Sequence, residues 1–373
     1  MPQTPLASSE SLLEELRSWV EIETPTTEPS AVNRLMDVAE DGLRRAGADL
    51  TRIPGRDGYA DNLVARTPGD GKPILIAGHL DTVWSIGTLE KMPFRVEGDQ
   101  AHGPGIYDMK AGSFLAFNAV REILRHGTKT NRPITLLLTP DEEVGSPTSR
   151  ALIEQEGRAA EYVLIPEPAG PGGVCVTARK GVGRFVIEIA GKGAHAGGNF
   201  PDGASAVVEL ARQIVRIHGM VDLDAGITLN AAPIWGGSRP NVIAPDAGCE
   251  VDLRVPTAEA GERMEAAMLG LEPFDPRCSI KVTGGMNRPP MAETEAILTL
   301  YGRARDVAQQ AGLTLGKQHR GGGSDGNFTA ALGVPTLDGL GCPGAGAHAS
   351  HEHIIWPLLA ARAQFLTGLL ETL

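Results

Sequence analysis

Five short segments of the 373-residue chain carry histidine and carboxylate side chains of the kinds that bind divalent metal ions. Together they offer two histidines and three carboxylates as ligands, with one further glutamate beside them. Nitrogen and oxygen ligands in this number suit two cations that share a carboxylate and activate a water molecule between them. An additional glutamate could move protons, so the set indicates a two-metal hydrolase. The segments are 78–82, 105–110, 141–143, 166–168 and 346–348.

The first segment contains a His-x-Asp pair, His79 and Asp81, directly after the apolar run 73–78. Open α/β sheets place their ligand sites at the carboxyl ends of such strands. In this arrangement the aspartate can fix the orientation of a metal-binding imidazole ring. Taken alone, the pair favours a turn histidine capped by an aspartate over a metal ligand.

The middle segments supply carboxylates. Asp108 lies in a glycine-rich turn before an expected helix, where it could bridge two cations or simply cap the helix. Asp141, Glu142 and Glu143 repel one another, so a nearby cation would explain the run; a solvated acidic turn is the alternative. Glu167 stands between two prolines, which hold the backbone extended and stiffen it.

The last segment leaves the ligand ambiguous. His348 follows a glycine-rich stretch, and His351 and His353 come soon after it. Three histidines therefore compete for one role. Each of the five segments is a weak signal alone, whereas their joint order along the chain is a strong one.

The elements that must position these residues follow an α/β pattern. Apolar runs at 73–78, 134–139 and 162–165 predict strands buried on both faces of a sheet. A helix expected over 111–126 lies between the first two, which gives a βαβ unit. Further helices are expected over 9–22 and 30–46, the second ending before Gly47.

The pattern changes near residue 178. We expect an α+β unit over 179–285, inserted into a larger catalytic domain formed by 1–178 and 286–373. After 286 the first pattern resumes, with helices expected over 293–311 and from Pro357. Within the insert, strands are expected at 185–190, 227–234, 249–255 and 279–283, and helices at 203–218 and 258–269.

Composition excludes several classes of function. A net charge of −12 with no basic run argues against nucleic acid as a partner. No apolar stretch approaches the ~20 residues that would span a bilayer, so no membrane partner is expected. The start of the chain shows no signal-peptide pattern, and the four cysteines are widely spaced, which favours a reducing compartment. We therefore expect a cytoplasmic protein.

The motifs in their order resemble one known family, the zinc-dependent aminoacylases, acetylornithine deacetylases and glutamate carboxypeptidases. The resemblance rests on Gly-His-x-Asp-Thr-Val, Gly-Pro-Gly-Ile-x-Asp-x-Lys, Asp-Glu-Glu-x-Gly-Ser, the later Glu-Pro and the final Gly-x-His. It covers nearly the whole chain. The stretches 103–106 and 321–325 resemble the bacterial glutamate carboxypeptidases in particular. The resemblance implies a mixed-sheet, zinc-exopeptidase-like catalytic domain with an inserted ferredoxin-like domain.

The resemblance also implies a role for each residue of the metal centre. His79 and Glu167 would bind one metal ion, Glu143 and His348 the other, and Asp108 would bridge them. His348 is preferred over His351 because Glu352 then follows four residues later, as in the family. Glu142 would be the general base, and Asp81 would orient His79. Zn²⁺ is the metal that the family implies, although ligands without cysteine suit Mn²⁺ and Co²⁺ as well.

For the inserted domain, the resemblance implies a lid that also joins two copies into a homodimer. His195 would enter the active site of the other copy, although a histidine in such a loop can also be a simple cap. Asn241 and Arg254 would hold a carboxylate of a small-molecule substrate, with Gly322 and Gly323 nearby. Arg254 could equally pair with a surface acid.

The expected reaction is hydrolysis of a peptide or N-acyl amide bond that releases an amino acid. Glutamate carboxypeptidase, N-acyl-amino-acid deacylase and dipeptidase cannot be separated by these motifs, and a deaminase of an unusual substrate is also open. The alternative from a different functional class is a metal-binding or ligand-binding protein of the same family that has lost catalysis. Glu142 argues against it, because a binding protein needs no spare base.

Overall fold

The computed structural model describes residues 3–5 and 7–373, which form two compact units. Unit 1 comprises the described residues up to Ala178 together with Glu293–Arg320 and Ser324–Leu373. Unit 2 comprises Arg179–Ala292 and Gly321–Gly323. The second boundary differs from the expected one at 285, which falls inside a strand that runs on to Arg288. That strand keeps pairing with its neighbour to its last residue, so the insert extends further than its sequence pattern indicated.

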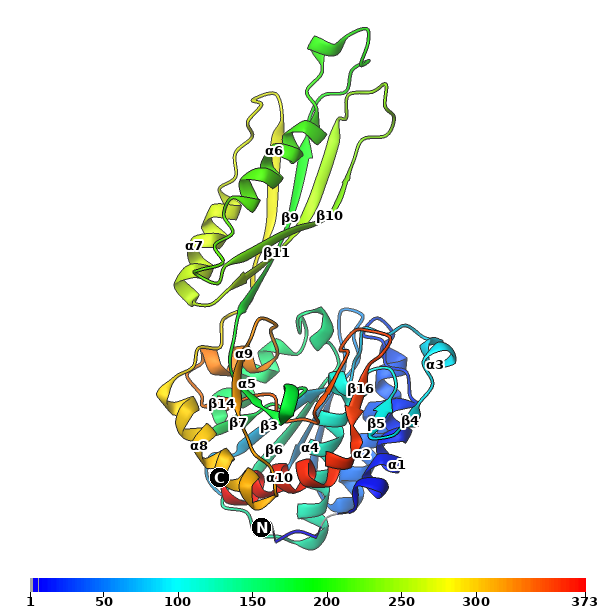
Figure 1. Ribbon diagram of the computed structural model, residues 1–373, viewed down its shortest axis with the longest axis vertical. Helices are drawn as coiled ribbons and strands as arrows, with labels where there is room; N and C mark the ends of the chain where they lie inside the picture. Colours follow the sequence, from blue (N-terminus) through cyan, green and yellow to red (C-terminus); the bar gives the residue numbers. More distant parts are fainter. Residues whose placement is uncertain (1–2, 6) are drawn as a thin grey trace. The chain divides into compact units, whose positions relative to one another are not determined.

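Unit 1 is built on a six-stranded mixed sheet with the strand order β1-β2-β6-β3-β7-β14 (Figure 1). Strands β6, β3, β7 and β14 run parallel to one another, whereas β1 and β2 are antiparallel to their neighbours. This arrangement confirms the expected mixed α/β class. The bounds are β1 Asp49–Ile53, β2 Asn62–Arg66, β3 Ile74–His79, β6 Ile134–Thr139, β7 Tyr162–Leu164 and β14 Thr336–Leu337.

Helices cover both faces of this sheet, as the unbroken apolar runs predict. All six residues of β3 are buried. Ile74 and Ile76 belong to one hydrophobic cluster, with helices α1, α2, α4, α8 and α10, and Leu75 and Ala77 to another, with α5 and α9. Alternate side chains thus point to opposite faces. The bounds are α1 Ser9–Val20, α2 Pro29–Ala46, α4 Ala111–His126, α5 Arg150–Ala159, α8 Glu295–Gln310, α9 Gly326–Ala331 and α10 Leu359–Thr372.

The helix ends follow ordinary capping chemistry. Ser8 caps α1, since its hydroxyl accepts a hydrogen bond from the N–H of Ser11. Helix α2 begins at Pro29 and ends at Ala46. Gly47 caps it with a φ of 90°, a left-handed conformation that glycine adopts readily. Helix α1 ends at Val20, two residues before the expected end.

Unit 1 also contains short strands that the sequence pattern did not indicate. They form a four-stranded sheet, β15-β16-β5-β4, and a pair, β13-β8. Among the described residues, no helix is long and apolar enough to cross a bilayer. The bounds are α3 Thr88–Lys91, β4 Arg95–Glu97, β5 Gln100–His102, β8 Cys175–Arg179, β13 Lys317–Arg320, β15 Gly344–Ala345 and β16 His353–Ile355.

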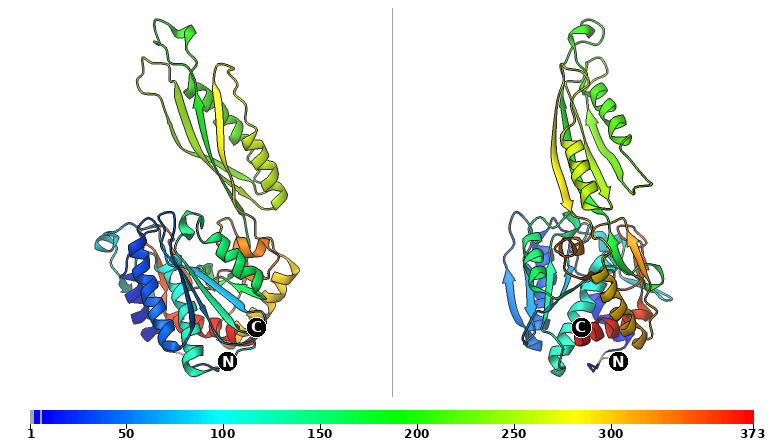
Figure 2. Two further views of the ribbon diagram at one scale, coloured as in Figure 1. Left: turned by 180° about the vertical axis from the view of Figure 1, so that it is seen from behind. Right: turned by 90° about the vertical axis from the view of Figure 1, so that its left-hand side faces the viewer.

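Unit 2 is a four-stranded antiparallel sheet with the order β10-β11-β9-β12 and two helices (Figure 2). Its element order is β9-α6-β10-β11-α7-β12, which is the ferredoxin-like arrangement. One hydrophobic cluster joins both helices to one face of the sheet. The bounds are β9 Gly181–Ala190, α6 Ala206–His218, β10 Thr228–Gly236, β11 Asp246–Val255, α7 Ala258–Leu269 and β12 Ser279–Arg288.

Candidate metal centre

Neighbouring parallel strands bring the candidate ligands to one edge of the sheet in unit 1. His79 is the last residue of β3, and β3 pairs with both β6 and β7. Glu142 and Glu143 follow β6 in a 3₁₀ turn, and Glu167 follows β7. The carboxyl ends of parallel strands meet at the same edge, so these side chains converge there.

Two further loops complete the centre. Asp108 lies in the turn that leads into α4, and His348 lies between β15 and β16. Gly112, in the first turn of α4, allows this helix to approach the segment of Glu167. A Cβ atom at Gly112 would lie 1.7 Å from the carbonyl oxygen of Pro166, so no other residue fits there without a shift.

The carboxylate of Asp108 lies between the two histidines. Its Oδ1 is 3.5 Å from Nε2 of His79, and its Oδ2 is 3.4 Å from Nε2 of His348. Each histidine has a second acid beside it. Glu167 Oε1 lies 3.8 Å from His79 Nε2, and Glu143 Oε2 lies 3.1 Å from His348 Nε2. The donor atoms therefore form two groups that share Asp108.

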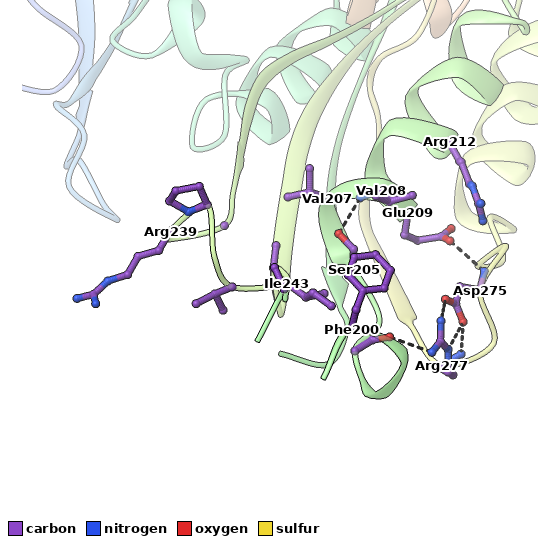
Figure 3. A pocket seen from close by; sticks show the side chains of 16 residues that line it. Phe200, Ser205, Val207, Val208, Glu209, Arg212, Arg239, Ile243, Asp275 and Arg277 are labelled. Atoms are coloured by element: carbon purple, nitrogen blue, oxygen red, sulfur yellow. Dashed lines mark hydrogen bonds and ion pairs between the residues drawn. The ribbon is translucent and has the colours of Figure 1, made fainter. Parts of the chain in front are cut away.

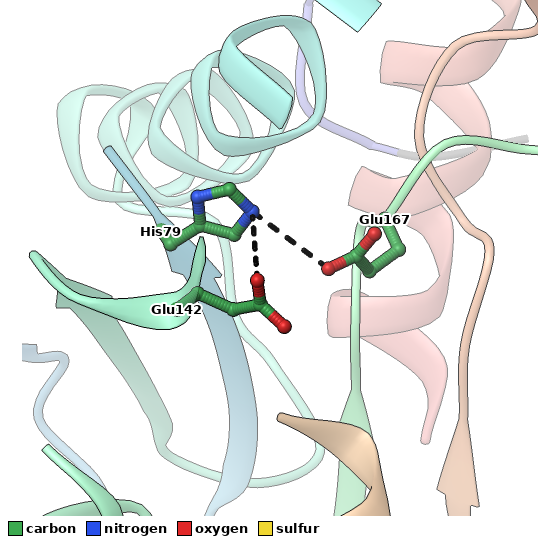
Figure 4. A group of neighbouring side chains, drawn as sticks. All are labelled: His79, Glu142 and Glu167. Atoms are coloured by element: carbon green, nitrogen blue, oxygen red, sulfur yellow. Dashed lines mark ion pairs between the residues drawn. The ribbon is translucent and has the colours of Figure 1, made fainter. Parts of the chain in front are cut away.

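Glu142 also points to Nε2 of His79. Its Oε2 lies 4.0 Å from Nε2 of His79. Figure 4 shows Glu142 and Glu167 both pointing toward this nitrogen. His79, Glu142 and Glu167 thus form one set of potential ligand atoms within 4.8 Å of one another, and His79, Asp108 and Glu143 form a second.

The electrostatics of the centre show that the acids attract positive charge. Burial opposes ionisation of Asp108, but His348 and His79 outweigh it and hold the pKa of Asp108 below its usual range. Contacts with Asp108 and Glu143 raise the pKa of His348 to about 10. Burial raises the pKa of Glu143. Protons on the histidines supply the positive charge here, and a bound cation would displace them, because metal ligands must be deprotonated.

The donor set fits divalent cations. Ligand atoms ~2 Å from a common zinc-like ion lie ~3–4 Å from one another. The four distances from His79 and His348 to their acids, 3.1 to 3.8 Å, fall in this range. Nε2 of His79 and Oε1 of Glu143 are buried without a hydrogen-bond partner among the described residues. Buried polar atoms are otherwise almost always paired, so these two have the character of metal ligands.

Asp81 supports this centre from behind. Nδ1 of the His79 ring lies 3.0 Å from the backbone oxygen of Asp81 and 3.3 Å from its Oδ1. A proton on Nδ1 would therefore leave Nε2 facing Asp108 as the ligand atom. The Asp81 carboxylate also accepts hydrogen bonds from the N–H groups of Glu142 and Glu143, each at 3.2 Å, and from the hydroxyl of Thr26 at 2.7 Å.

Asp141, the first of the three consecutive acids, belongs to the scaffold. It is fully buried, and its carboxylate accepts hydrogen bonds from the N–H groups and the hydroxyls of Thr148 and Ser149. Only Glu142 and Glu143 point to the cluster. The hydrogen bonds from Thr148 and Ser149 thus partly offset the repulsion between Asp141 and the two glutamates that follow it.

The structure separates the three competing histidines. Only His348 contacts the acids of the cluster. His351 is exposed, and its carbonyl oxygen lies 2.9 Å from Nδ1 of His353. His353 pairs across the small sheet with His102, their ring centroids 5.2 Å apart.

Two residues near the centre were not anticipated as functional. In the sequence, Glu352 only indicates which histidine fits the spacing of the family. In the structure, its buried carboxylate accepts hydrogen bonds from the turn that carries Asp108. Lys110 is also buried, and its Nζ donates to the carbonyl oxygen of Ile22 at 2.6 Å. Local sequence carries no signal for these contacts, because the partners are distant along the chain.

In unit 2, the loops of His195 and Asn241 lie side by side. The N–H of Ala196 donates to the carbonyl oxygen of Asn241 at 3.0 Å. Nδ1 of His195 accepts hydrogen bonds from the N–H groups of Gly197 (3.1 Å) and Gly198 (3.0 Å). Nδ1 is therefore an acceptor, and the neutral ring carries its proton on Nε2.

Arg254 lies apart from these loops within unit 2. It is near the end of β11, whereas the segment of Asn241 leads into the start of that strand. Its guanidinium group makes a two-point contact with Asp252, at 2.7 and 2.9 Å. Arg254 is therefore paired with an acid of unit 2, as the alternative to substrate binding expects.

Gly322 and Gly323 are held by arginine side chains of unit 2. Their carbonyl oxygens accept hydrogen bonds from Nη1 of Arg179, at 3.2 and 3.4 Å. A Cβ atom at Gly323 would lie 2.8 Å from Cδ of Arg288, so glycine permits this close approach. Neither arginine was anticipated from the sequence.

Comparison with known proteins decides the family. The model of peptidase family M20/M25/M40 matches residues 75–372. Carboxypeptidase G2 of Pseudomonas sp. (strain RS-16) is 33% identical over 354 residues, which cover 92% of this chain and 85% of that protein. The chain belongs to peptidase family M20/M25/M40.

Two solved structures share the fold. Aminopeptidase PepT from Bacillus cereus has a TM-score of 0.78 at 23% identity, with 98% of both chains covered. YxeP of Bacillus subtilis, described as a dinuclear metal-binding peptidase of the M20 family, has a TM-score of 0.68 at 15% identity, with 98% of this chain and 99% of that chain covered. Family membership and the candidate ligand cluster together make this M20 chain a dinuclear metallohydrolase of amide bonds.

Proposed function

We propose that the chain is a metal-dependent carboxypeptidase of the glutamate carboxypeptidase type, which releases an amino acid from a peptide or N-acyl amide. The observation that carries this proposal is the position of Asp108, whose two oxygens face two different histidines. The similarity to carboxypeptidase G2, at 33% identity over most of both chains, supports the substrate type.

In this proposal, His79 and Glu167 bind one metal ion, and Glu143 and His348 bind the other. Asp108 is shared between them. The pairwise distances at the centre support this division, because each histidine has its own acid besides Asp108. Zn²⁺ is the proposed metal, and the nitrogen and oxygen ligands also fit Mn²⁺ and Co²⁺.

When bound, the two cations activate a water molecule and polarise the carbonyl group of the substrate. Glu142 accepts a proton from this water and donates it to the leaving nitrogen. Its backbone is held for this role by the hydrogen bond from its N–H to Asp81. Asp81 also holds the Nδ1 side of the His79 ring, so one carboxylate orients both a ligand and the proposed base.

The substrate carboxylate is proposed to bind to Arg254, near Gly322 and Gly323. Asn241 lies before the start of the ten-residue strand β11 and Arg254 near its end, so within one copy the two residues cannot contact the same carboxylate. A guanidinium group matches two carboxylate oxygens, and Arg254 already makes such a contact with Asp252. A substrate carboxylate would therefore exchange with Asp252. Arg254→Lys should raise KM for the substrate more than it lowers kcat, because a lysine cannot make the two-point contact.

We further propose that unit 2 acts as a lid and joins two copies of the chain. Strand β10 has only one neighbour in its sheet, so its outer edge is open to pairing. Exposed apolar side chains on α6 and β10 add to this edge, namely Val208, Val215, Ile234 and Trp235. A pocket of ≈530 Å³ adjoins α6, with Phe200, Val207, Val208 and Ile243 in its lining (Figure 3).

The dimer has a direct test in solution. Val215→Asp should convert a dimer into a monomer, as measured by light scattering, because it places a charge in the proposed apolar contact. Lys281→Asp, an exposed position on β12 at the other edge of the sheet, is the matched control and should stay dimeric. A wild-type protein that is monomeric at micromolar concentration would contradict the proposal.

His195 is proposed to serve the active site of the second copy. Its Nε2–H is available as a donor, since Nδ1 is occupied by two backbone N–H groups. Such a donor would stabilise the oxyanion that forms on the substrate. Mixing His195→Ala with Glu142→Ala subunits should restore part of the activity, and no recovery in a mixed dimer would remove His195 from this role.

The substrate type is tested with a panel of amides. Protein stripped of metal and reloaded with Zn²⁺, Mn²⁺ or Co²⁺ is given N-acetyl, N-benzoyl and dipeptide derivatives of acidic, basic and apolar amino acids. We expect release of acidic amino acids that depends on metal. Preference for simple N-acyl groups would indicate a deacylase, and preference for dipeptides with a free amino group a dipeptidase. A protein that binds two metal ions and cleaves none of the amides in the panel would refute the proposed function.

We also propose that the enzyme works in the cytoplasm. All four cysteines are unpaired and buried, which fits a reducing compartment. Fractionation of source cells with an antibody against the chain tests this, and recovery outside the cytoplasm would refute it.

A further inference from the structure

We propose that Glu352 is a positioning residue of the metal centre, which fixes the turn that presents Asp108 and ties it to the loop that presents His348. This inference rests on the proposed metal-binding roles of Asp108 and His348. It assigns to Glu352 no contact with metal or substrate.

The contacts of Glu352 converge on the Asp108 turn. Its Oε1 accepts hydrogen bonds from the N–H groups of Tyr107 at 2.9 Å and Asp108 at 3.0 Å. Its Oε2 accepts from the N–H of Gly105 at 3.0 Å and from Nε1 of Trp84 at 2.8 Å. Each carboxylate oxygen therefore accepts hydrogen bonds from two donors, and three of these four donors belong to the turn of Asp108.

The turn needs an external acceptor because its backbone is not helical where Asp108 lies. Asp108 has φ −115° and ψ 99°, and Met109 has φ −128° and ψ 37°, so regular helical bonding begins only with α4. Buried N–H groups must still be satisfied, and a carboxylate does this for several at once. The conformation that aims Asp108 at both histidines thus depends on Glu352.

The backbone of Glu352 connects this turn to the other ligand loop. Its N–H donates to the carbonyl oxygen of Ala349 at 2.9 Å. The N–H of Ala349 donates in turn to the carbonyl oxygen of Gly346, also at 2.9 Å. His348 lies within these two turns, with a left-handed φ of 61°. One compact loop therefore holds a proposed ligand and, four residues later, the carboxylate that holds the bridging ligand.

The side chain is also enclosed. Glu352 is 1% exposed, so water cannot replace a lost acceptor easily. Charged outer contacts of this kind typically change metal affinity or activity by ~10–100-fold when removed. A purely structural carboxylate would affect folding without changing the geometry of the metal site.

The test compares two buried carboxylates. Glu352→Gln keeps the size of the side chain but turns an amide NH₂ toward N–H donors. Glu371→Gln is the matched control, since Glu371 is buried and accepts hydrogen bonds from the N–H groups of Gln3 and Thr4 and from the Thr4 hydroxyl, away from the metal ligands. Each protein is loaded with Co²⁺, and the visible absorption spectrum, the affinity against a competing chelator and the unfolding temperature of the metal-free form are measured.

We expect Glu352→Gln to lower the affinity for metal ~10–100-fold and to change the cobalt spectrum, with Glu371→Gln wild-type in both. A wild-type spectrum and affinity in Glu352→Gln, with only the unfolding temperature lowered, would overturn the inference. If Glu352→Gln does not fold, Glu352→Asp takes its place, since it keeps the charge but shortens the reach to the N–H groups of Gly105, Tyr107 and Asp108. An unchanged cobalt spectrum and affinity in that variant would overturn the inference too. A wild-type protein that binds no pair of metal ions would instead refute the proposed function itself.

Discussion

The carboxylate of Asp81 accepts a hydrogen bond from the backbone N–H of Glu142, with 3.2 Å between Oδ1 and N. The same oxygen lies 3.3 Å from Nδ1 of His79. A single buried side chain therefore fixes a proposed metal ligand and the proposed general base. This geometry explains how His79, at the end of β3, and Glu142, in the turn after β6, keep a constant position relative to each other.

Asp81→Asn should reduce activity while the protein stays folded. The amide keeps one acceptor but offers a donor to the N–H groups of Glu142 and Glu143, so their turn shifts. We expect kcat/KM to fall ~10–100-fold. Thr26→Val, which removes the hydroxyl contacts to Oδ2 of Asp81 and to the carbonyl oxygen of Thr82, is the matched control and should cost less. Equal losses in both variants would contradict a special role of Asp81 beyond packing.

Glu142→Gln should separate catalysis from metal binding. The glutamine cannot accept the proton of the attacking water, and general acid–base catalysis typically contributes ~10²–10⁴-fold to the rate. We expect kcat to fall by this factor while metal content, measured by mass spectrometry, stays at the wild-type value. Glu143→Gln, one residue later, should instead lose metal. Activity of Glu142→Gln within a few-fold of wild type would exclude the role of base.

Asp141→Ala should destabilise the protein without a direct effect on chemistry. The substitution leaves the N–H groups and hydroxyls of Thr148 and Ser149 without their acceptor. Each buried donor left unsatisfied costs ~1–3 kcal/mol, so a clear drop in the urea midpoint is expected. Residual folded enzyme at low temperature should keep near-normal KM. An unchanged midpoint would show that these contacts contribute little.

The stability of unit 1 should depend on pH through Glu293. Contacts with Lys317, Thr177 and His319 lower the pKa of Glu293 from 4.5 to about 2. Because the folded-state pKa is the lower one, this stabilisation is present above pH 4.5 and is lost as pH falls toward 2. Glu293→Gln should therefore lower the urea midpoint at pH 7, with the difference from wild type shrinking below pH 4.5. A difference that is constant from pH 7 to 3 would refute the linkage.

The framework of unit 1 could be predicted from its sequence because burial on both faces leaves a continuous apolar run. Strands β3 and β6 are such runs, and helix α4 matches its expected bounds, 111–126. Strand β1 alternates between exposed and half-buried residues, and β4, β5 and β16 have three residues each, so no local pattern marks them. The end of the insert was misplaced because β12 becomes more polar before it ends.

The convergence of the candidate ligands could be predicted because each of them ends or follows a strand or lies in a glycine-rich turn. The support of these ligands could not, because the partners are far apart in sequence. Glu352 and Asp108 are 244 residues apart, and Thr26 and Asp81 are 55 apart. The structural role of Asp141 could not be predicted for a related reason, since only the fold shows that Thr148 and Ser149 surround it. Sequence spacing identifies ligands, whereas the residues that orient them depend on tertiary packing.

The central claim is that two metal ions bind on either side of Asp108. Anomalous diffraction at the zinc edge, from crystals of zinc-loaded protein, tests it most directly. We expect two peaks, one between His79 and Glu167 and one between Glu143 and His348, with Asp108 contacting both. A single peak, or peaks away from these residues, would contradict it.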